Sequence, residues 1–142
     1  MRDAARRAGT LIELALTLAM LAIVLAVSVP SVRTILDRLG VRGARQDVVL
    51  GLWAARTVAT MRGQFASFHL DSAGRLRVVC AGDTVFARDL VARRGVRVDV
   101  TRDSITYAPT GMGWGAANTR IVVSRGRRAD TVTTSRLGRV AF

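Results

Sequence analysis

The chain has 142 residues, enough for one globular domain at most. Its 22 basic and 10 acidic side chains give a formal net charge of +12, and every basic residue is arginine. The single cysteine, Cys80, excludes a disulfide within the chain and a metal site built from several cysteines, and the single histidine, His69, leaves little for acid–base catalysis. The charge suits nucleic acid or an anionic membrane surface, although a codon bias toward arginine would produce it without any binding site.

An uncharged apolar stretch of 19 residues runs from Leu14 to Val32, behind a short basic segment at residues 1–8. As a helix this stretch would be about 28 Å long, close to the hydrocarbon thickness of a bilayer. We therefore expect a membrane-spanning helix. A cleaved secretory signal is the alternative, because the small residues at 26–28 would suit a signal peptidase and would leave a mature chain that begins near residue 29.

Glu13, the only glutamate of the chain, stands at the start of this stretch. A carboxylate at the centre of a bilayer costs about 2.5–3.5 kcal/mol even on insertion scales, and less near the interface at a helix start. The string Arg6-Arg7-Ala8-Gly9-Thr10-Leu11-Ile12-Glu13-Leu14, followed by an apolar helix, closely resembles the class III signal of type IV pilins and pseudopilins. Glu13 and Pro30 are 17 residues apart, which is also the family spacing.

The resemblance implies that a prepilin peptidase removes the leader, residues 1–8, by cleavage between Ala8 and Gly9. The new amino terminus at Gly9 would then be N-methylated. The family usually has glycine before the cut and phenylalanine after it, and this sequence has neither. Cleavage between Gly9 and Thr10 therefore stays open as an alternative.

The resemblance also assigns an assembly role to Glu13 and Pro30. The Glu13 carboxylate would pair with the amino terminus of a neighbouring subunit, because an uncompensated charge in an apolar bundle is costly, and this pairing would select the axial register. Pro30 lacks a backbone donor and is expected to kink or locally melt the helix. Residues 9–32 would form the transmembrane and filament-core helix in the inner membrane, with residues 33–142 in the periplasm.

Beyond the apolar stretch, apolar residues recur at helical spacing with arginines on the opposite face. We predict one long helix from Leu11 to Met61, loosened around Gly40–Gly43 because each glycine costs up to about 1 kcal/mol in a helix. The second half of this helix would pack one stripe against a domain, and Leu52 and Trp53 are expected in the core.

After residue 63 the period changes to two, which predicts strands joined by turns. Short strands with no helix between them indicate an antiparallel sheet or a small sandwich, so the expected fold class is α+β. Cys80 is expected to behave as a small core hydrophobe. The predicted strands are Phe65–Leu70, Arg75–Cys80, Val96–Val100, Ile105–Tyr107, Arg120–Ser124, Thr131–Ser135 and Arg136–Phe142.

Three features of this second half recur together in one group of proteins. A strand that ends in an aromatic residue precedes Pro and Gly within Ile105–Gly111, an apolar strand with a polar end follows at Arg120–Ser124, and Gly-Arg-Val stands at residues 138–140. In these features the chain resembles the GspH/FimT group of the pilin superfamily. The resemblance implies a pilin-like fold, with the long helix packed on C-terminal β structure, and a structural subunit without enzymatic activity.

No constellation typical of catalysis, metal binding or cofactor binding is found. Gly111–Ala116 formally contains a G-x-G-x-x-A string, but a dinucleotide site needs a strand directly before it and a helix opening from it. Pro109 intervenes and a strand follows, so we expect a turn. His69 has no clustered carboxylate or thiol, and Asp99 and Asp103 are typical of a strand end and a turn. We predict no catalytic residue, no metal and no cofactor.

The arginines near the end of the chain are candidate nucleic-acid contacts. Arg125, Arg127 and Arg128 in a flexible turn could clamp phosphates. Some relatives on the FimT side are DNA receptors that use arginines after a glycine, and Arg139 matches this pattern only in part, with Ala141 in place of the second arginine. A solvated basic face is the alternative, since few aromatic residues are available to stack bases.

The sequence thus predicts a minor pseudopilin of a type II secretion system, processed by prepilin peptidase and assembled with other pseudopilins or pilins in contact with inner-membrane lipid. The alternative is a FimT-like minor pilin of a type IV pilus that binds DNA during uptake. A soluble secreted protein with an ordinary signal is the third interpretation.

Overall fold

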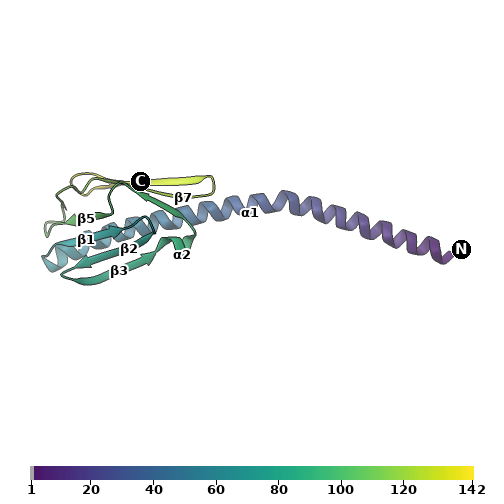
Figure 1. Cartoon of the computed structure of the whole chain (residues 1–142), viewed down its shortest axis with the longest axis horizontal. Coiled ribbons are helices and arrows are strands. Elements are labelled where there is room, and N and C mark those ends of the chain that lie inside the picture. The colour runs from purple at the N-terminus through teal and green to yellow at the C-terminus, as the bar shows by residue number, and fades with distance from the viewer. Residues whose placement is uncertain (1) are drawn as a thin grey trace. The chain divides into compact units, whose positions relative to one another are not determined.

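The computed structural model (Figure 1) describes the backbone of residues 2–142 and the side chains of residues 11–26, 28 and 32–142. The chain divides into two compact units, Met1–Leu36 and Asp37–Phe142. The first helix, α1 (Arg2–Arg62), begins in the first unit and ends in the second. The predicted cleavage residues Ala8 and Gly9, and also Pro30, lie outside the residues whose side chains are described.

The first unit consists of α1 alone, and every described side chain from Leu11 to Ala26 is exposed. Thr17 Oγ1 donates to the carbonyl of Leu14 at 2.8 Å, so this hydroxyl is satisfied within the helix. Across the residues with described side chains, no helical segment is sufficiently long and apolar to traverse a bilayer.

In the second unit, α1 buries one stripe against the sheets. The stripe recurs every three or four residues, as the sequence predicts, and Leu52 within it is fully buried. The prediction for Trp53 is wrong, because this side chain is 63% exposed. One residue along a helix turns by about 100°, which carries Trp53 off the stripe that holds Leu52. The buried apolar residues of the stripe are Val41, Ala44, Val48, Leu52, Ala55 and Ala59.

The helix is also unbroken through Gly40–Gly43, where loosening was expected. These glycines are buried and mark places of close approach. A methyl group built on Gly43 would lie 2.8 Å from Cζ of Arg94, and one on Gly51 would lie 2.9 Å from Cδ2 of Leu76. The glycines therefore lower the helix propensity of this segment but allow close packing, and this packing stabilises the helix.

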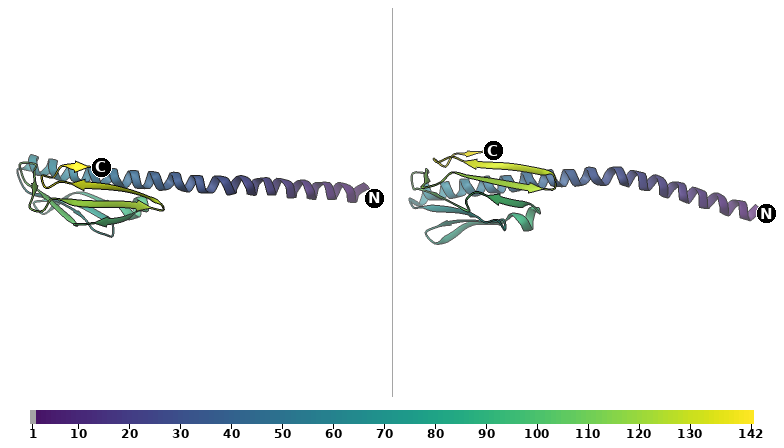
Figure 2. Two further views of the ribbon diagram at one scale, coloured as in Figure 1. Left: turned by 90° about the horizontal axis from the view of Figure 1, so that it is seen from above. Right: turned by 45° about the horizontal axis from the view of Figure 1, so that its top comes forward.

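Two antiparallel sheets lie alongside this part of α1 (Figure 2). The first has the strand order β3-β2-β1-β5-β6 and the second has the order β4-β7-β8-β9. The bounds in the first sheet are β1 Ala66–Leu70, β2 Arg75–Cys80, β3 Asp83–Asp89, β5 Ser104–Tyr107 and β6 Gly113–Trp114. Those in the second are β4 Arg97–Val100, β7 Thr119–Arg125, β8 Arg128–Thr134 and β9 Val140–Ala141.

The α+β class and the antiparallel sheet structure are confirmed, and β2 has the predicted bounds. The expectation that no helix interrupts the strands is wrong, because β3 and the short helix α2 (Leu90–Arg94) follow β2. Edge strand β3 is mostly exposed, so it lacks the alternation that marks a half-buried strand. Asp89 caps α2 by accepting from the amide of Ala92 at 2.8 Å, and Gly95 ends it in the left-handed conformation.

The core is contained within the second unit. Cys80 is a buried free thiol, as expected, and His69 on β1 is paired across the sheet with Arg77 and Ser104. Every buried side chain among the described residues belongs to residue 41 or later, so a chain that lacks the first unit keeps this whole core. We therefore expect residues 37–142 to fold on their own, and a fragment of residues 34–142 isolates this unit. Its largest fully buried side chains are Tyr107, Phe68, Leu52, Leu70, Leu76 and Leu90.

Tyr107, the only tyrosine, joins the two sheets. It ends β5 in the first sheet, and its hydroxyl donates at 3.3 Å to the carbonyl of Gly138, in the turn before β9 of the second. The amide of Gly113 bonds the same turn through the carbonyl of Leu137 at 3.2 Å. Burial raises the pKa of the Tyr107 hydroxyl above its usual value of 10.0, against a smaller opposing effect of the Arg56 charge.

Tyr107→Phe in the fragment of residues 34–142 should lower the free energy of unfolding by about 1 kcal/mol at neutral pH, because the Gly138 carbonyl loses its donor. This difference should narrow as the pH rises above 10. The unfolded chain then ionises its tyrosine while the folded chain, whose pKa is raised, does not, so only the parent protein loses stability. Chemical denaturation across this pH range measures the difference.

The phenolate absorbance of the parent protein provides the control, since it reports on Tyr107 alone. A stability difference that is constant above pH 10 would show that the hydroxyl titrates equally in both states.

Candidate functional site

Glu13 is exposed in the first unit and lies beside exposed apolar side chains. Its neighbours Leu11, Ile12 and Leu14 are all exposed by more than half of their surface. Among the residues whose side chains are described, none forms an ion pair with Glu13. The Glu13 side chain and the apolar surface around it are both exposed to solvent.

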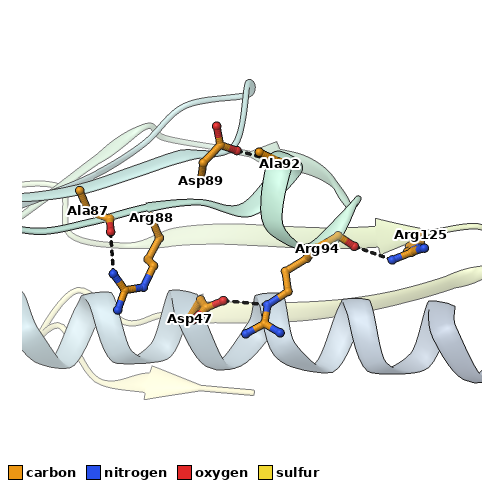
Figure 3. A network of polar contacts seen from close by, with 7 residues as sticks. All are labelled: Asp47, Ala87, Arg88, Asp89, Ala92, Arg94 and Arg125. Atoms are coloured by element: carbon orange, nitrogen blue, oxygen red, sulfur yellow. Dashed lines mark hydrogen bonds and ion pairs between the residues drawn. The ribbon is translucent and has the colours of Figure 1, made fainter.

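Two arginines from the sheet layer lie against α1 at its glycines (Figure 3). Arg94, at the end of α2, donates from Nε to Oδ2 of Asp47 at 3.1 Å, and its side chain packs on Gly43. Arg125, at the end of β7, pairs through Nε with Oδ1 of Asp37 at 3.2 Å. The guanidinium of Arg125 also donates from Nη1 to the carbonyl of Arg94 at 2.6 Å, so the two contacts are linked.

The sequence-based interpretation named only Arg125 of this network and missed Asp37, Asp47 and Arg94, of which Asp47 is the buried one. It is the one charged side chain in the core stripe of α1, at the position next to Val48. A carboxylate placed at a core position of a predicted helix signals a buried cationic partner, because an unpaired buried charge is costly. The partner itself is 47 residues away in sequence and could not be identified from spacing.

A third link joins α1 to β8. Arg45 Nη1 lies 3.3 Å from Oδ2 of Asp130, and the guanidinium carbon of Arg45 is 5.1 Å from the ring centre of Phe142. This geometry is that of a cation–π contact. The Arg45 side chain therefore positions the last residue of the chain over the solvent-facing side of α1.

The structure does not bring the four candidate nucleic-acid contacts together as one site. Arg125 is half-buried and engaged with Asp37. Arg127 and Arg128 are exposed at the turn between β7 and β8, where Arg125 pairs with Arg128 across the hairpin. Arg139 is exposed in the segment before β9. Only Arg127 and Arg128 are exposed neighbours.

The glycine-rich string at Gly111–Ala116 forms a turn and the short strand β6, and the next element is strand β7. The expectation of a turn in place of a dinucleotide fingerprint is thus confirmed. Trp114 is exposed and packs edge-to-face on Phe65, with 5.2 Å between ring centres. Within the described residues, no three metal-ligating side chains gather in one place.

No protein-family model matches the chain, and no curated protein matches it by sequence. Solved structures do match. The type IV minor pilin FimU of Pseudomonas aeruginosa strain PAO1 is similar with a TM-score of 0.62 and 14% identity, over 73% of this chain and 88% of FimU.

Two structures of EpsH, the minor pseudopilin of the type II secretion system of Vibrio cholerae, are also similar. One has a TM-score of 0.54 and 14% identity over 70% of this chain and 91% of EpsH. The other has a TM-score of 0.55 and 13% identity over 74% and 93%. The chain therefore has the pilin-like fold of these minor subunits, as the resemblance in the sequence implied.

Asp47→Ala in the fragment of residues 34–142 should lower the free energy of unfolding by about 1–3 kcal/mol, because Arg94 loses its acceptor next to the core. Asp83→Ala is the matched control. It removes an aspartate that also pairs with an arginine, Arg62, but the Asp83 side chain is 76% exposed, against 12% for Asp47. The control should lose less than about 1 kcal/mol. Equal losses in denaturant titrations would contradict a structural role of the Arg94–Asp47 pair.

Proposed function

We propose that this protein is a minor pseudopilin, a non-enzymatic subunit of a type II secretion pseudopilus that works in protein secretion. The observation that carries the proposal is the combination of a fold shared with EpsH and FimU and a single glutamate at the start of an apolar helix. Neither feature alone is specific. The fold supports a minor pilin-like role, and Glu13 supports assembly into a filament.

The exposed apolar surface of the first unit is the physical reason for this proposal. Large apolar side chains from Leu11 to Leu25 are exposed by about half or more. Contiguous exposed apolar surface of this extent marks a membrane or protein contact. A membrane can cover the surface before assembly, and the helices of neighbouring subunits can cover it afterwards.

The Glu13 carboxylate makes the packing of neighbouring subunits' helices against this surface selective. Within a bundle of apolar helices, an unpaired carboxylate is penalised by several kcal/mol, whereas a carboxylate beside the amino terminus of a neighbour is compensated. Cleavage between Ala8 and Gly9 by prepilin peptidase would create that terminus, and N-methylation of Gly9 would keep it cationic. We propose that the protein lies in the inner membrane through residues 9–32, with its C-terminal domain in the periplasm.

The second candidate is a minor pilin of a type IV pilus, which the similarity to FimU favours. In its FimT-like form this protein would bind DNA through the exposed arginines Arg127 and Arg128, with Arg139 as a separate contact. A strain without the protein distinguishes the candidates. Loss of protein secretion with pili intact supports the pseudopilin, and loss of pili with secretion intact supports the pilin.

N-terminal sequencing of the protein extracted from membranes should find a start at Gly9, because cleavage there places Glu13 and Pro30 at the family positions. A start at Thr10 would move the bond by one residue and keep the proposal. A start beyond Ser28 would identify an ordinary secretory signal and contradict the proposed function.

Glu13→Ala should reduce incorporation into filaments by at least about a hundredfold while the protein still inserts in the membrane, since the unmatched amino terminus costs about 3–5 kcal/mol in an apolar bundle. Thr17→Ala, one turn further along the same exposed helix, is the control and should assemble normally. Membrane fractionation and filament shearing measure the two steps. Normal assembly of the Glu13→Ala protein would refute the pairing.

A further inference from the structure

Three clefts in the second unit lie in succession along α1. The first lies between α1 and the start of β8, has a volume of about 310 Å³ and is lined in part by Arg45. The second, of about 350 Å³, is lined by both Arg45 and Phe142. The third, of about 470 Å³, contains Phe142 and reaches Thr57. Neighbouring clefts share a lining residue, and together they follow α1 from Arg38 to Thr57; we call this surface the α1 groove.

The centre of the α1 groove is apolar and open to solvent. Leu50 is 57% exposed, Trp53 is 63% exposed and Phe142 is 66% exposed. Trp53 lies off the core stripe of the helix, so packing of the domain does not explain its size or position. Exposed large aromatic side chains beside a cleft are typical of the centre of a protein interface.

Both ends of the α1 groove are basic. Arg38, Arg42 and Arg128 line one end, and Arg56 and Arg139 line the other. Among the described residues, none of these five arginines has a carboxylate partner. The only acidic residue that lines the three clefts is Asp130, and Arg45 already holds it at 3.3 Å. The groove therefore offers unneutralised positive charge on either side of an apolar centre.

The charge of the second unit disfavours a second copy as the occupant of the groove. Residues 37–142 contain 18 arginines and eight aspartates, a net charge of +10. Two such units would repel each other across basic ends that face like charges. A nucleic acid would satisfy the arginines but would leave the aliphatic centre at Leu50 without apolar cover. A protein segment with carboxylates at its ends and apolar residues between them satisfies both parts.

The length of the groove and the edge of strand β8 favour a helix as the conformation of the bound protein segment. Arg38 and Thr57 are 19 residues apart on α1, so the groove is about 28 Å long, the length of a helix of about twenty residues. β9 leaves part of the β8 edge open, but addition of a strand there is disfavoured because the amide of Thr131 already donates to the Asp130 carboxylate at 2.9 Å.

We propose that the α1 groove is the docking site for an acidic amphipathic helix of a different protein. Apolar residues in the middle of that helix cover Leu50, Trp53 and Phe142, and its carboxylates pair with the arginines at each end. The docking site is built only from contacts and charges of the second unit, whereas assembly into a filament in the proposed function depends on Glu13 in the first unit. The two proposals can therefore fail separately.

The test uses Trp53 as its own reporter. Trp114→Phe in the fragment of residues 34–142 leaves Trp53 as the only tryptophan. The probe is a synthetic helical peptide of about twenty residues with a stripe of leucine and phenylalanine in the middle and glutamates at both ends. Binding should bury Trp53, shift its emission to the blue and weaken by at least about tenfold when the salt is raised from low to molar concentration. No shift, or an equal shift with a scrambled peptide of the same composition, would overturn the proposal.

A charge swap tests the basic end. Arg42→Glu with Arg128→Glu should weaken binding of the acidic peptide at least about tenfold, and a peptide with lysines at the end that meets these two positions and glutamates at the other end should bind this variant in its place. Recovery of binding by the swapped peptide also shows that the variant is folded.

Arg77→Glu with Arg120→Glu is the matched control, since both arginines are exposed on the sheets and the change in net charge is the same. This control should bind the acidic peptide nearly as the parent does. Equal losses of peptide affinity in the two double variants would show that net charge alone determines binding and would contradict the proposed docking site. A single-stranded oligonucleotide of matched charge that quenches Trp53 and outcompetes the peptide at physiological salt would overturn it in favour of nucleic acid.

Discussion

The close approach of α1 to the sheets at three buried glycines is the constraint on which the second unit depends. Gly51 admits the side chains of the first sheet, and Gly40 and Gly43 admit the guanidinium groups of Arg125 and Arg94. A Cβ atom at any of these positions would come within about 3 Å of its neighbours. The two arginines then reach carboxylates on the helix itself, so the contacts that fix α2 and β7 on α1 exist only because the helix surface is flat there.

These glycines also explain which parts of the fold the sequence could predict. Periodicity identifies the second half of α1 and β2 because each buries one side against the core at the period of its element. Periodicity fails at Gly40–Gly43. The low helix propensity of glycine predicts a loosened helix there, and the arginine side chains that pack on these glycines are far away in the sequence. Periodicity also fails at β3, an edge strand with a register shift where it pairs with β2, and at Trp53, which is apolar and next to the core stripe but points off it. The local sequence pattern therefore predicts helices and strands, whereas close contacts between them become visible only in the structure.

The candidate sites also divide into one that the local sequence pattern predicts and one that only the structure reveals. Glu13 could be identified from the sequence because its signal is local: one charge within a continuous apolar helix, with a proline at a fixed distance. The α1 groove could not, because residues from α1, β8 and the end of the chain create it together. The arginines near the end of the chain looked alike in sequence, but the structure separates Arg125, which is occupied by Asp37, from Arg127 and Arg128, which are exposed.

All 22 basic residues of the chain are arginines, and their positions in the fold bear on why lysine is absent. A codon bias would raise the number of arginines without regard to position, and it accounts for a basic surface in general. It does not account for Arg94 and Arg125, whose planar guanidinium groups lie against glycine and donate in fixed directions, one of them to a carboxylate and a backbone carbonyl together. An ammonium group on a flexible stem does not reproduce that geometry. In the groove, the five arginines at the two ends flank exposed aromatic residues. Composition supplied the arginines, and the fold has put some of them to structural use and left others arranged for a partner.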